Sequence, residues 1–229
     1  VYISPVAVVF NLDGIDSLNL TPETIAGIFN EDITTWNDPA IAADNPDVEL
    51  PDTAISPVHR SDPSGTSETF TSYLESVVPD AWPHEASDEW PLSTGEAAQG
   101  TSGVIAAVSG GSGTIGYADA SQAGDLGTVA VGVAGEFVPY SSEAAAQLVD
   151  ASPLAEGRGE GDLVFEIDPA TAPAGSYPIA LVSYLISCVE YDDAATAELV
   201  KEYFSYVVSA EGQDVAAEAA GSAPLSDSL

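Results

Sequence analysis

The residues in this sequence that could do chemistry are concentrated in one short segment, 60–67 (RSDPSGTS). A short strand pattern at 55–59 leads into this segment, and a helical pattern follows it. The first N–H groups of a helix have no intrahelical partner and lie at the positive end of the helix dipole. Gly65 would let a ligand approach the backbone closely, and the hydroxyls of Ser64 and Thr66 would add donors. The segment therefore predicts an oxyanion site at a helix N-terminus.

Arg60 would add a planar, permanently charged donor to this site. Asp62 follows two residues later, close enough to hold the guanidinium in one orientation. A simpler interpretation uses the same residues, because Ser-Gly-Thr at a helix start is common as plain capping and an Arg–Asp pair is often a surface ion pair. The residues alone leave both interpretations open.

The charge balance excludes two classes of partner. Asp and Glu number 37 against three Lys and Arg, and the net charge is −34 at pH 7. Such a surface repels nucleic acid and anionic membranes, so we expect neither as a partner. Anion affinity would have to come from local, desolvated hydrogen bonds rather than from a basic patch. Adaptation to high salt and an acidic secreted protein both explain this charge, and the sequence does not separate them.

The elements around the site predict a layered α/β fold with at least partly parallel strands, because strand and helix patterns alternate. Hydrophobic residues make up 45% of the 229, which is enough for a buried core. No apolar run approaches the roughly 20 residues that cross a bilayer. Strands are expected at 6–11, 55–59, 113–117 and 131–138, the last with a turn, and helices after Thr21, after Pro39, and at 66–77 and 103–108.

The C-terminal third is expected to need further chain beside it. Residues 177–187 have the apolar pattern of a long buried strand, and Cys188 follows as a buried, inert thiol. Helices are expected at 192–209 and 211–220. One strand and two helices cannot close a sheet of their own. The first of these helices has an apolar face that comprises Val200, Tyr203, Phe204, Val207 and Val208.

Other chemistry finds little support in the sequence. His59 and His84 stand in no metal-ligand spacing, and a lone histidine at a strand end is more often structural. Ser64 and Ser102 lie in glycine-bearing turns, but neither stands in a G-x-S-x-G elbow. We therefore expect no catalytic residue, no metal and no cofactor. The three tryptophans are expected to be packing anchors rather than sugar platforms: Trp36, Trp82 and Trp90.

The segment 60–67, followed by 70–74 (FTSYL), resembles the signature of the phosphate-binding protein of bacterial ABC phosphate importers. The resemblance covers nearly the whole chain in the right order. It includes 33–41 (ITTWNDPAI), 113–117 (GTIGY), 177–179 (YPI) and 221–226 (GSAPLS).

This resemblance implies a two-lobed periplasmic-binding-protein fold of type II, here one complete lobe plus the C-terminal part of the other. Residues 1–176 would form the second lobe, with hinge strands at its ends, and 177–229 the C-terminal portion of the first. Arg60 would donate to phosphate oxygens and Asp62 would brace it. The other donors would be the Ser64 hydroxyl, the Gly65 N–H, and both the hydroxyl and the N–H of Thr66.

The function implied is extracytoplasmic binding of inorganic phosphate and its delivery to the membrane permease of an ABC importer. The protein would be a monomer in the periplasm or at the cell surface, or held there by a lipid on a segment before Val1. The family's proteins carry such a preceding segment, with a second helix-start loop and a carboxylate that accepts the ligand's proton, so this chain would hold about half the site. Two alternatives remain: a phosphatase-like enzyme that reuses the anion cradle, and a non-binding surface protein of the same fold.

Overall fold

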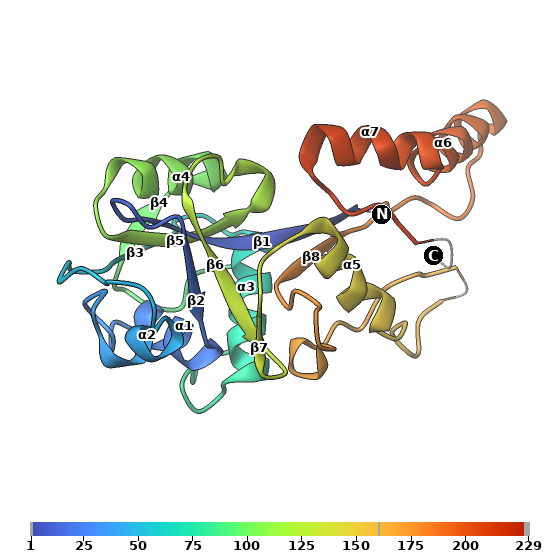
Figure 1. The fold of residues 1–229 in the computed structure, drawn as a ribbon. Coiled ribbons are helices and arrows are strands. Elements are labelled where there is room, and N and C mark those ends of the chain that lie inside the picture. Colours follow the sequence, from blue (N-terminus) through green and yellow to red (C-terminus); the bar gives the residue numbers. More distant parts are fainter. Residues whose placement is uncertain (1, 160, 227–229) are drawn as a thin grey trace.

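The computed structural model describes residues 2–159 and 161–226, and within them one mixed sheet forms the centre of the molecule (Figure 1). Its strand order is β2-β6-β1-β5-β3-β4, with β7 paired to β6 and β8 paired to β1. Val1 lies outside the described residues. The strands are β1 (Tyr2–Asn11), β2 (Ser17–Leu20), β3 (Ser56–Arg60), β4 (Glu96–Ala98), β5 (Thr114–Asp119), β6 (Gly127–Val133), β7 (Glu136–Val138) and β8 (Ala180–Ser183).

The helices cover both faces of this sheet, with α4 on one face and α1 and α3 on the other (Figure 1). None of the helices in the described residues is long and apolar enough to cross a membrane. Their bounds are α1 (Pro22–Phe29), α2 (Pro39–Asp44), α3 (Gly65–Val77), α4 (Gly100–Gly110), α5 (Ser142–Ala151), α6 (Ala194–Val207) and α7 (Ala210–Ala220).

Strand β1 lies in the middle of the sheet and is buried on both faces, which explains its unbroken apolar run. Val6, Val8 and Phe10 join the core cluster beneath α1 and α3. Ala7 and Val9 point the other way, into the cluster beneath α4. This alternation follows from the two-residue repeat of a strand. The strand predicted at 6–11 is therefore confirmed and begins earlier, at Tyr2.

The directions of the strands decide where the candidate site lies. Strand β1 is antiparallel to β5, β6 and β8, whereas β3 is parallel to both β4 and β5. The prediction of partly parallel strands is thus confirmed. Because β3 and β4 run side by side in the same direction, their carboxyl ends meet at one edge of the sheet. Helix α3 begins shortly after β3, and α4 begins shortly after β4, so both helix N-termini lie at this edge.

Local capping explains the first helices. The Thr21 hydroxyl accepts a hydrogen bond from the N–H of Thr24, and Pro22 occupies the first turn of α1. Trp36 is fully buried and donates its indole N–H to the carbonyl oxygen of Gly113 at 3.0 Å. Trp82 is also fully buried, which confirms that these tryptophans are packing residues.

The long buried strand predicted at 177–187 is wrong in its length. Strand β8 has four residues, pairs with Tyr2–Pro5 of β1, and ends at Ser183. Beyond it the chain leaves the sheet: Ile186 is 91% exposed and Val189 is 99% exposed. Cys188 is exposed, so the prediction of a buried thiol is wrong as well. The apolar pattern predicted burial, but among the described residues β1 is the only strand that pairs with β8.

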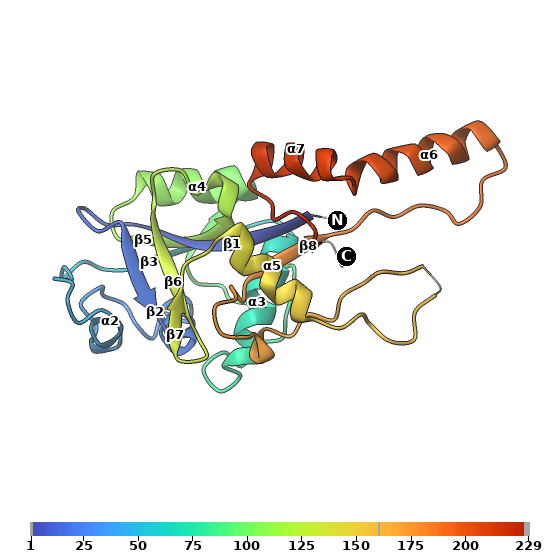
Figure 2. The same ribbon diagram turned by 45° about the vertical axis from the view of Figure 1, so that its right-hand side comes forward.

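Helices α6 and α7 lie where the sequence predicts them, but the apolar face predicted for α6 is largely exposed. Of the predicted apolar face of α6, only Val207 is buried, and Tyr203 is 57% exposed. Both helices extend away from the sheet (Figure 2). Helix α5 was not predicted; it packs on β1 and β8 and buries Leu148 and Val149 against Ile3.

Candidate functional site

Ser64 begins α3 and is its N-cap. The side chain is buried, and its Oγ accepts hydrogen bonds from the N–H of Thr66 at 3.1 Å and from the N–H of Ser67 at 3.4 Å. The interpretation of Ser64 as a helix cap is therefore correct. The anion-site interpretation depends on what else converges on this helix end.

Arg60 ends β3, and its guanidinium is held by three hydrogen bonds. Nε donates to Asp62 Oδ1 at 2.9 Å, Nη2 donates to Asp62 Oδ2, and Nη1 donates to Ser64 Oγ at 2.7 Å. The first two bonds form a bidentate pair, the arrangement that best matches the geometry of both groups. The side chain is 12% exposed, so the fork is shielded from competing water. Arg60 thus stands in one orientation beside the N-terminus of α3.

Asp62 links the two helix ends. The first N–H of α4, that of Gly100, donates to Asp62 Oδ1 at 2.9 Å. The hydrogen bond from Arg60, followed by the one from Gly100, holds the pKa of the Asp62 carboxyl well below its usual range. The hydrogen bond to Asp62 likewise raises the pKa of Arg60. Both groups are therefore charged at neutral pH, as the predicted bracing role requires.

The contacts of Ser64 Oγ determine what its hydroxyl can do. Three donors point at this oxygen, from Arg60 Nη1, Thr66 N and Ser67 N. Since the oxygen's acceptor capacity is then used, the hydroxyl proton must point outward, toward an incoming acceptor. An oxygen surrounded by donors is also a poor nucleophile, because nothing withdraws its proton.

Two further donors are available at the same helix end. Within the described residues, neither the Gly65 N–H nor the Thr66 hydroxyl makes a hydrogen bond. Gly65 borders a groove of about 390 Å³ between α3, the segment 165–169 and β8. A Cβ on Gly65 would lie 3.4 Å from Leu181 Cδ1 of β8, so this side of the helix end is close to a neighbouring element. Gly65 is itself exposed, so the helix end is accessible from outside the molecule.

The structure brings all five predicted residues, Arg60, Asp62, Ser64, Gly65 and Thr66, together at the start of α3. The Gly100 N–H, which also contacts this site, was not among the predicted groups. The glycine-bearing start of a second helix after a short strand was a signal that could have revealed it.

His59 has a structural role, as expected for a lone histidine at a strand end. Its Nδ1 contacts the carbonyl oxygen of Arg60 at 2.9 Å, so Nδ1 carries a proton and donates it. Its ring stacks on Trp90 with 5.0 Å between ring centroids. Within the described part of the chain, no group of three or more His, Cys, Asp and Glu side chains could hold a metal ion.

Comparison with known proteins places this chain in a family. Phosphate-binding protein PstS 3 of Mycobacterium tuberculosis (strain ATCC 25618 / H37Rv) is 36% identical over 216 residues, which are 92% of this chain and 58% of the relative. Phosphate-binding protein PstS 2 of the same strain is 34% identical over 231 residues, 98% of this chain and 61% of the relative. The chain therefore spans about three fifths of the length of these relatives.

Solved structures share the fold at low sequence identity. A periplasmic phosphate-binding protein, PfluDING, bound with phosphate, matches with a TM-score of 0.76 and 22% identity, over 99% of this chain and 67% of the other. A phosphate-binding protein from Stenotrophomonas maltophilia matches with a TM-score of 0.70 and 21% identity, over 98% and 66%. Residues 1–211 match the model of the PBP superfamily domain. The chain belongs to the PBP superfamily.

Proposed function

We propose that this chain binds inorganic phosphate at the N-terminus of α3, as the solute-binding component of an ABC phosphate importer. One observation carries the proposal: the donors of Arg60, Ser64, Gly65 and Thr66 converge on one accessible helix end. The printed names of the relatives, which are phosphate-binding proteins, support this ligand.

The arrangement suits a tetrahedral oxyanion. The helix N-terminus offers the Gly65 N–H at the positive end of its dipole, and Arg60 adds a full charge. Because Asp62 already holds the guanidinium in place, little side-chain freedom remains to be lost on binding. Anion affinity in a chain of net charge −34 then comes from a few short, oriented hydrogen bonds.

Binding is favoured over a phosphatase-like reaction by the surroundings of Ser64. Its oxygen receives three donors and faces no base within the described residues, whereas a nucleophilic serine needs a neighbouring group that takes its proton. A site that offers hydrogen-bond donors but no activated nucleophile can bind an anion and release it unchanged.

We also propose the division into lobes, with residues 1–176 as the second lobe and 177–229 as the C-terminal part of the first. Helix α6 exposes Leu199, Tyr203 and Tyr206, as a helix would whose sheet is completed by further strands. If the division is right, residues 1–176 expressed alone will unfold cooperatively in urea. A gradual loss of structure without a cooperative transition would contradict the division into lobes.

The partners and location follow from the same proposal. The phosphate-loaded protein would act as a monomer outside the cytoplasm, in the periplasm or at the cell surface, and deliver its ligand to a membrane permease. Deleting the gene should slow growth on limiting phosphate, and growth unchanged from that of the parent would contradict this role.

The binding proposal is tested by titrating the chain with phosphate, and with sulfate as control, at high salt. Binding is followed through the amide NMR signals of Gly65 and Thr66, which detect even weak occupancy. We expect saturable shifts of these two signals. No shift of either signal would contradict the proposal.

The sulfate control has its own expected result. The predicted contacts to the ligand are all made by donors, and the Asp62 oxygens already accept from Arg60 and Gly100. Phosphate that carries a proton is distinguished from sulfate only by an acceptor for that proton. We therefore expect the two anions to bind this chain with similar affinity. A strong preference for phosphate would mean that an acceptor faces the ligand.

A further inference from the structure

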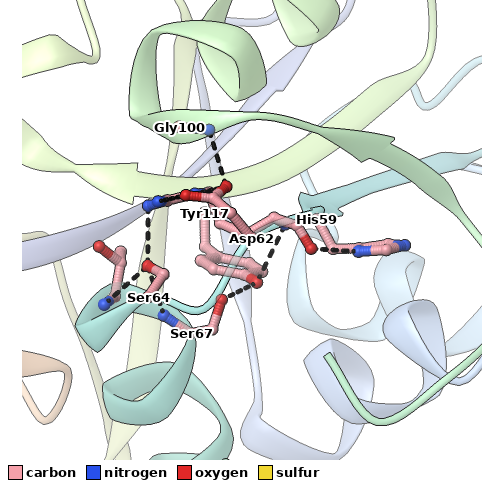
Figure 3. Close-up of polar contacts among 8 residues, drawn as sticks. His59, Asp62, Ser64, Ser67, Gly100 and Tyr117 are labelled. Carbon is pink, nitrogen blue, oxygen red and sulfur yellow. Dashed lines mark hydrogen bonds and ion pairs between the residues drawn. The ribbon is translucent and has the colours of Figure 1, made fainter. Parts of the chain in front are cut away.

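Tyr117 of β5 lies beneath the segment 60–67, and its hydroxyl contacts both ends of that segment (Figure 3). Its Oη lies 2.7 Å from Ser67 Oγ, in the first turn of α3. It also accepts a hydrogen bond from the backbone N–H of Arg60 at 3.4 Å, at the end of β3. One oxygen atom therefore joins the strand that positions the arginine to the helix that offers the N–H groups.

The tyrosine itself is held rigidly. Its ring stacks on Phe70 with 4.5 Å between centroids and an interplanar angle of 13°, and Trp90 stacks at 5.7 Å. The side chain is only 1% exposed, and this burial raises the pKa of Tyr117, so the hydroxyl keeps its proton at neutral pH. Because the ring is packed tightly, its hydroxyl holds both of its hydrogen-bond partners in place.

The middle of the segment is tied to its surroundings by other bonds: Ser61 N–H donates to Ala98 O, Ser64 N–H donates to Asp88 O, and the Asp62 carboxylate accepts from the Gly100 N–H. Those bonds fix its middle.

Two other contacts set the distance between the guanidinium of Arg60 and the first N–H groups of α3. Ser64 Oγ joins them directly, because it accepts from Arg60 Nη1 and from the N–H groups of Thr66 and Ser67. Tyr117 Oη joins the backbone of Arg60 to the side chain of Ser67 beneath them. An oxyanion site depends on that distance, because donors displaced by about an ångström lose most of their hydrogen-bond energy.

We propose that Tyr117 is a positioning residue for anion binding, which acts through Arg60 and Ser67 and does not touch the ligand. This inference rests on the proposed function. Together with Ser64 Oγ, the hydroxyl sets the spacing between the end of β3 and the start of α3, and so between the charged donor and the helix donors.

The test removes the hydroxyl oxygen of Tyr117 and leaves its ring in place. Tyr117→Phe is expected to weaken phosphate binding about two- to tenfold, which corresponds to the net contribution of one hydrogen bond. Ser67→Ala should also weaken it, by no more than Tyr117→Phe does, because it removes only the contact between Ser67 and Tyr117. The double variant should bind no more weakly than Tyr117→Phe, because that change alone already removes this contact. Tyr73→Phe is the matched control: Tyr73 lies on α3, is equally buried, and its hydroxyl has no partner among the described residues. It should leave the affinity unchanged.

A second measurement is independent of ligand. Exchange of the Arg60 backbone N–H with deuterium should be faster in Tyr117→Phe than in the wild-type chain, and unchanged in Tyr73→Phe. Equal Arg60 exchange in the wild type and Tyr117→Phe overturns the inference, as does an unchanged affinity. A wild-type chain that binds no anion overturns the proposed function, and the exchange rates then still decide whether Tyr117 holds the segment.

Discussion

Arg60 differs from the other two cations of the chain in its surroundings rather than in its charge. Arg158 and Lys201 are exposed, whereas Arg60 is largely buried and bonded to Asp62 and Ser64. A charged donor shielded from water and held in one orientation contributes much more to anion binding than a solvated one.

Replacing Arg60 by Ala should therefore lower phosphate affinity about 100-fold or more, since a hydrogen bond to a charged group contributes roughly 1.5–3 kcal/mol and more than one is lost. Titration calorimetry at high salt measures the change. Arg158→Ala is the control, because it removes the same charge from an exposed position, and it should alter affinity less than twofold. Equal losses in the two variants would show that only net charge matters.

Asp62 should make stability depend on pH. Its folded pKa lies below the ordinary value of 3.8, so its contribution is fully present above that value and is lost as pH falls toward the folded pKa. The difference in unfolding free energy between the wild type and Asp62→Asn should be constant near neutral pH and should shrink below about pH 4. Urea unfolding at stepped pH and constant salt measures it. A difference that does not vary with pH would contradict the bracing role.

At the scale of elements, the start of β5 depends on a glycine. Gly113 has φ of +79°, and a Cβ there would lie 2.4 Å from the carbonyl oxygen of Ala54. Its N–H donates to Asn11 O, and its carbonyl oxygen accepts the indole N–H of Trp36. The turn before β5 therefore allows no side chain without moving backbone.

Gly113→Ala should reduce the free energy of unfolding by about 2–4 kcal/mol, from backbone strain and the clash together. Gly110→Ala is the control, because a Cβ at that end of α4 meets nothing within 4 Å. That change should leave stability unaltered or raise it by up to about 1 kcal/mol, the helix preference of alanine over glycine. Thermal unfolding compares the two, and similar melting temperatures would contradict this account of the turn.

At the scale of the whole molecule, 37 carboxylates against three cations dominate the electrostatics. The ion pair between Arg60 and Asp62 is the only one in the described part of the chain, so most carboxylates have no cationic partner there. The compact state brings these charges close together, and their mutual repulsion opposes folding.

Salt should therefore stabilise the chain strongly. The screening length falls from about 10 Å at 0.1 M to about 3 Å at 1 M, so the melting temperature should rise steeply over this range of KCl. Sucrose at matched osmolality is the control, because it stabilises compact states without screening charge. A melting temperature that responds equally to both would contradict an electrostatic origin.

The sequence by itself determined the features that depend on neighbours along the chain. The helix after Thr21, the donors around Ser64 and the strand at 6–11 were all predicted, because capping and strand periodicity are local interactions. The five predicted site residues lie within seven positions of one another, so one strand end and one helix start bring them together.

Only the tertiary structure decided what depends on distant segments. The Gly100 N–H reaches Asp62 across 38 positions and Tyr117 reaches Ser67 across 50, because β3 lies between β4 and β5 in the sheet. The exposure of Cys188 was decided in the same way: an apolar run is buried only where another element covers it, and beyond Ser183 none of the described elements does. Local pattern specifies which surface a segment can bury, and the packing of the whole chain specifies whether it is buried.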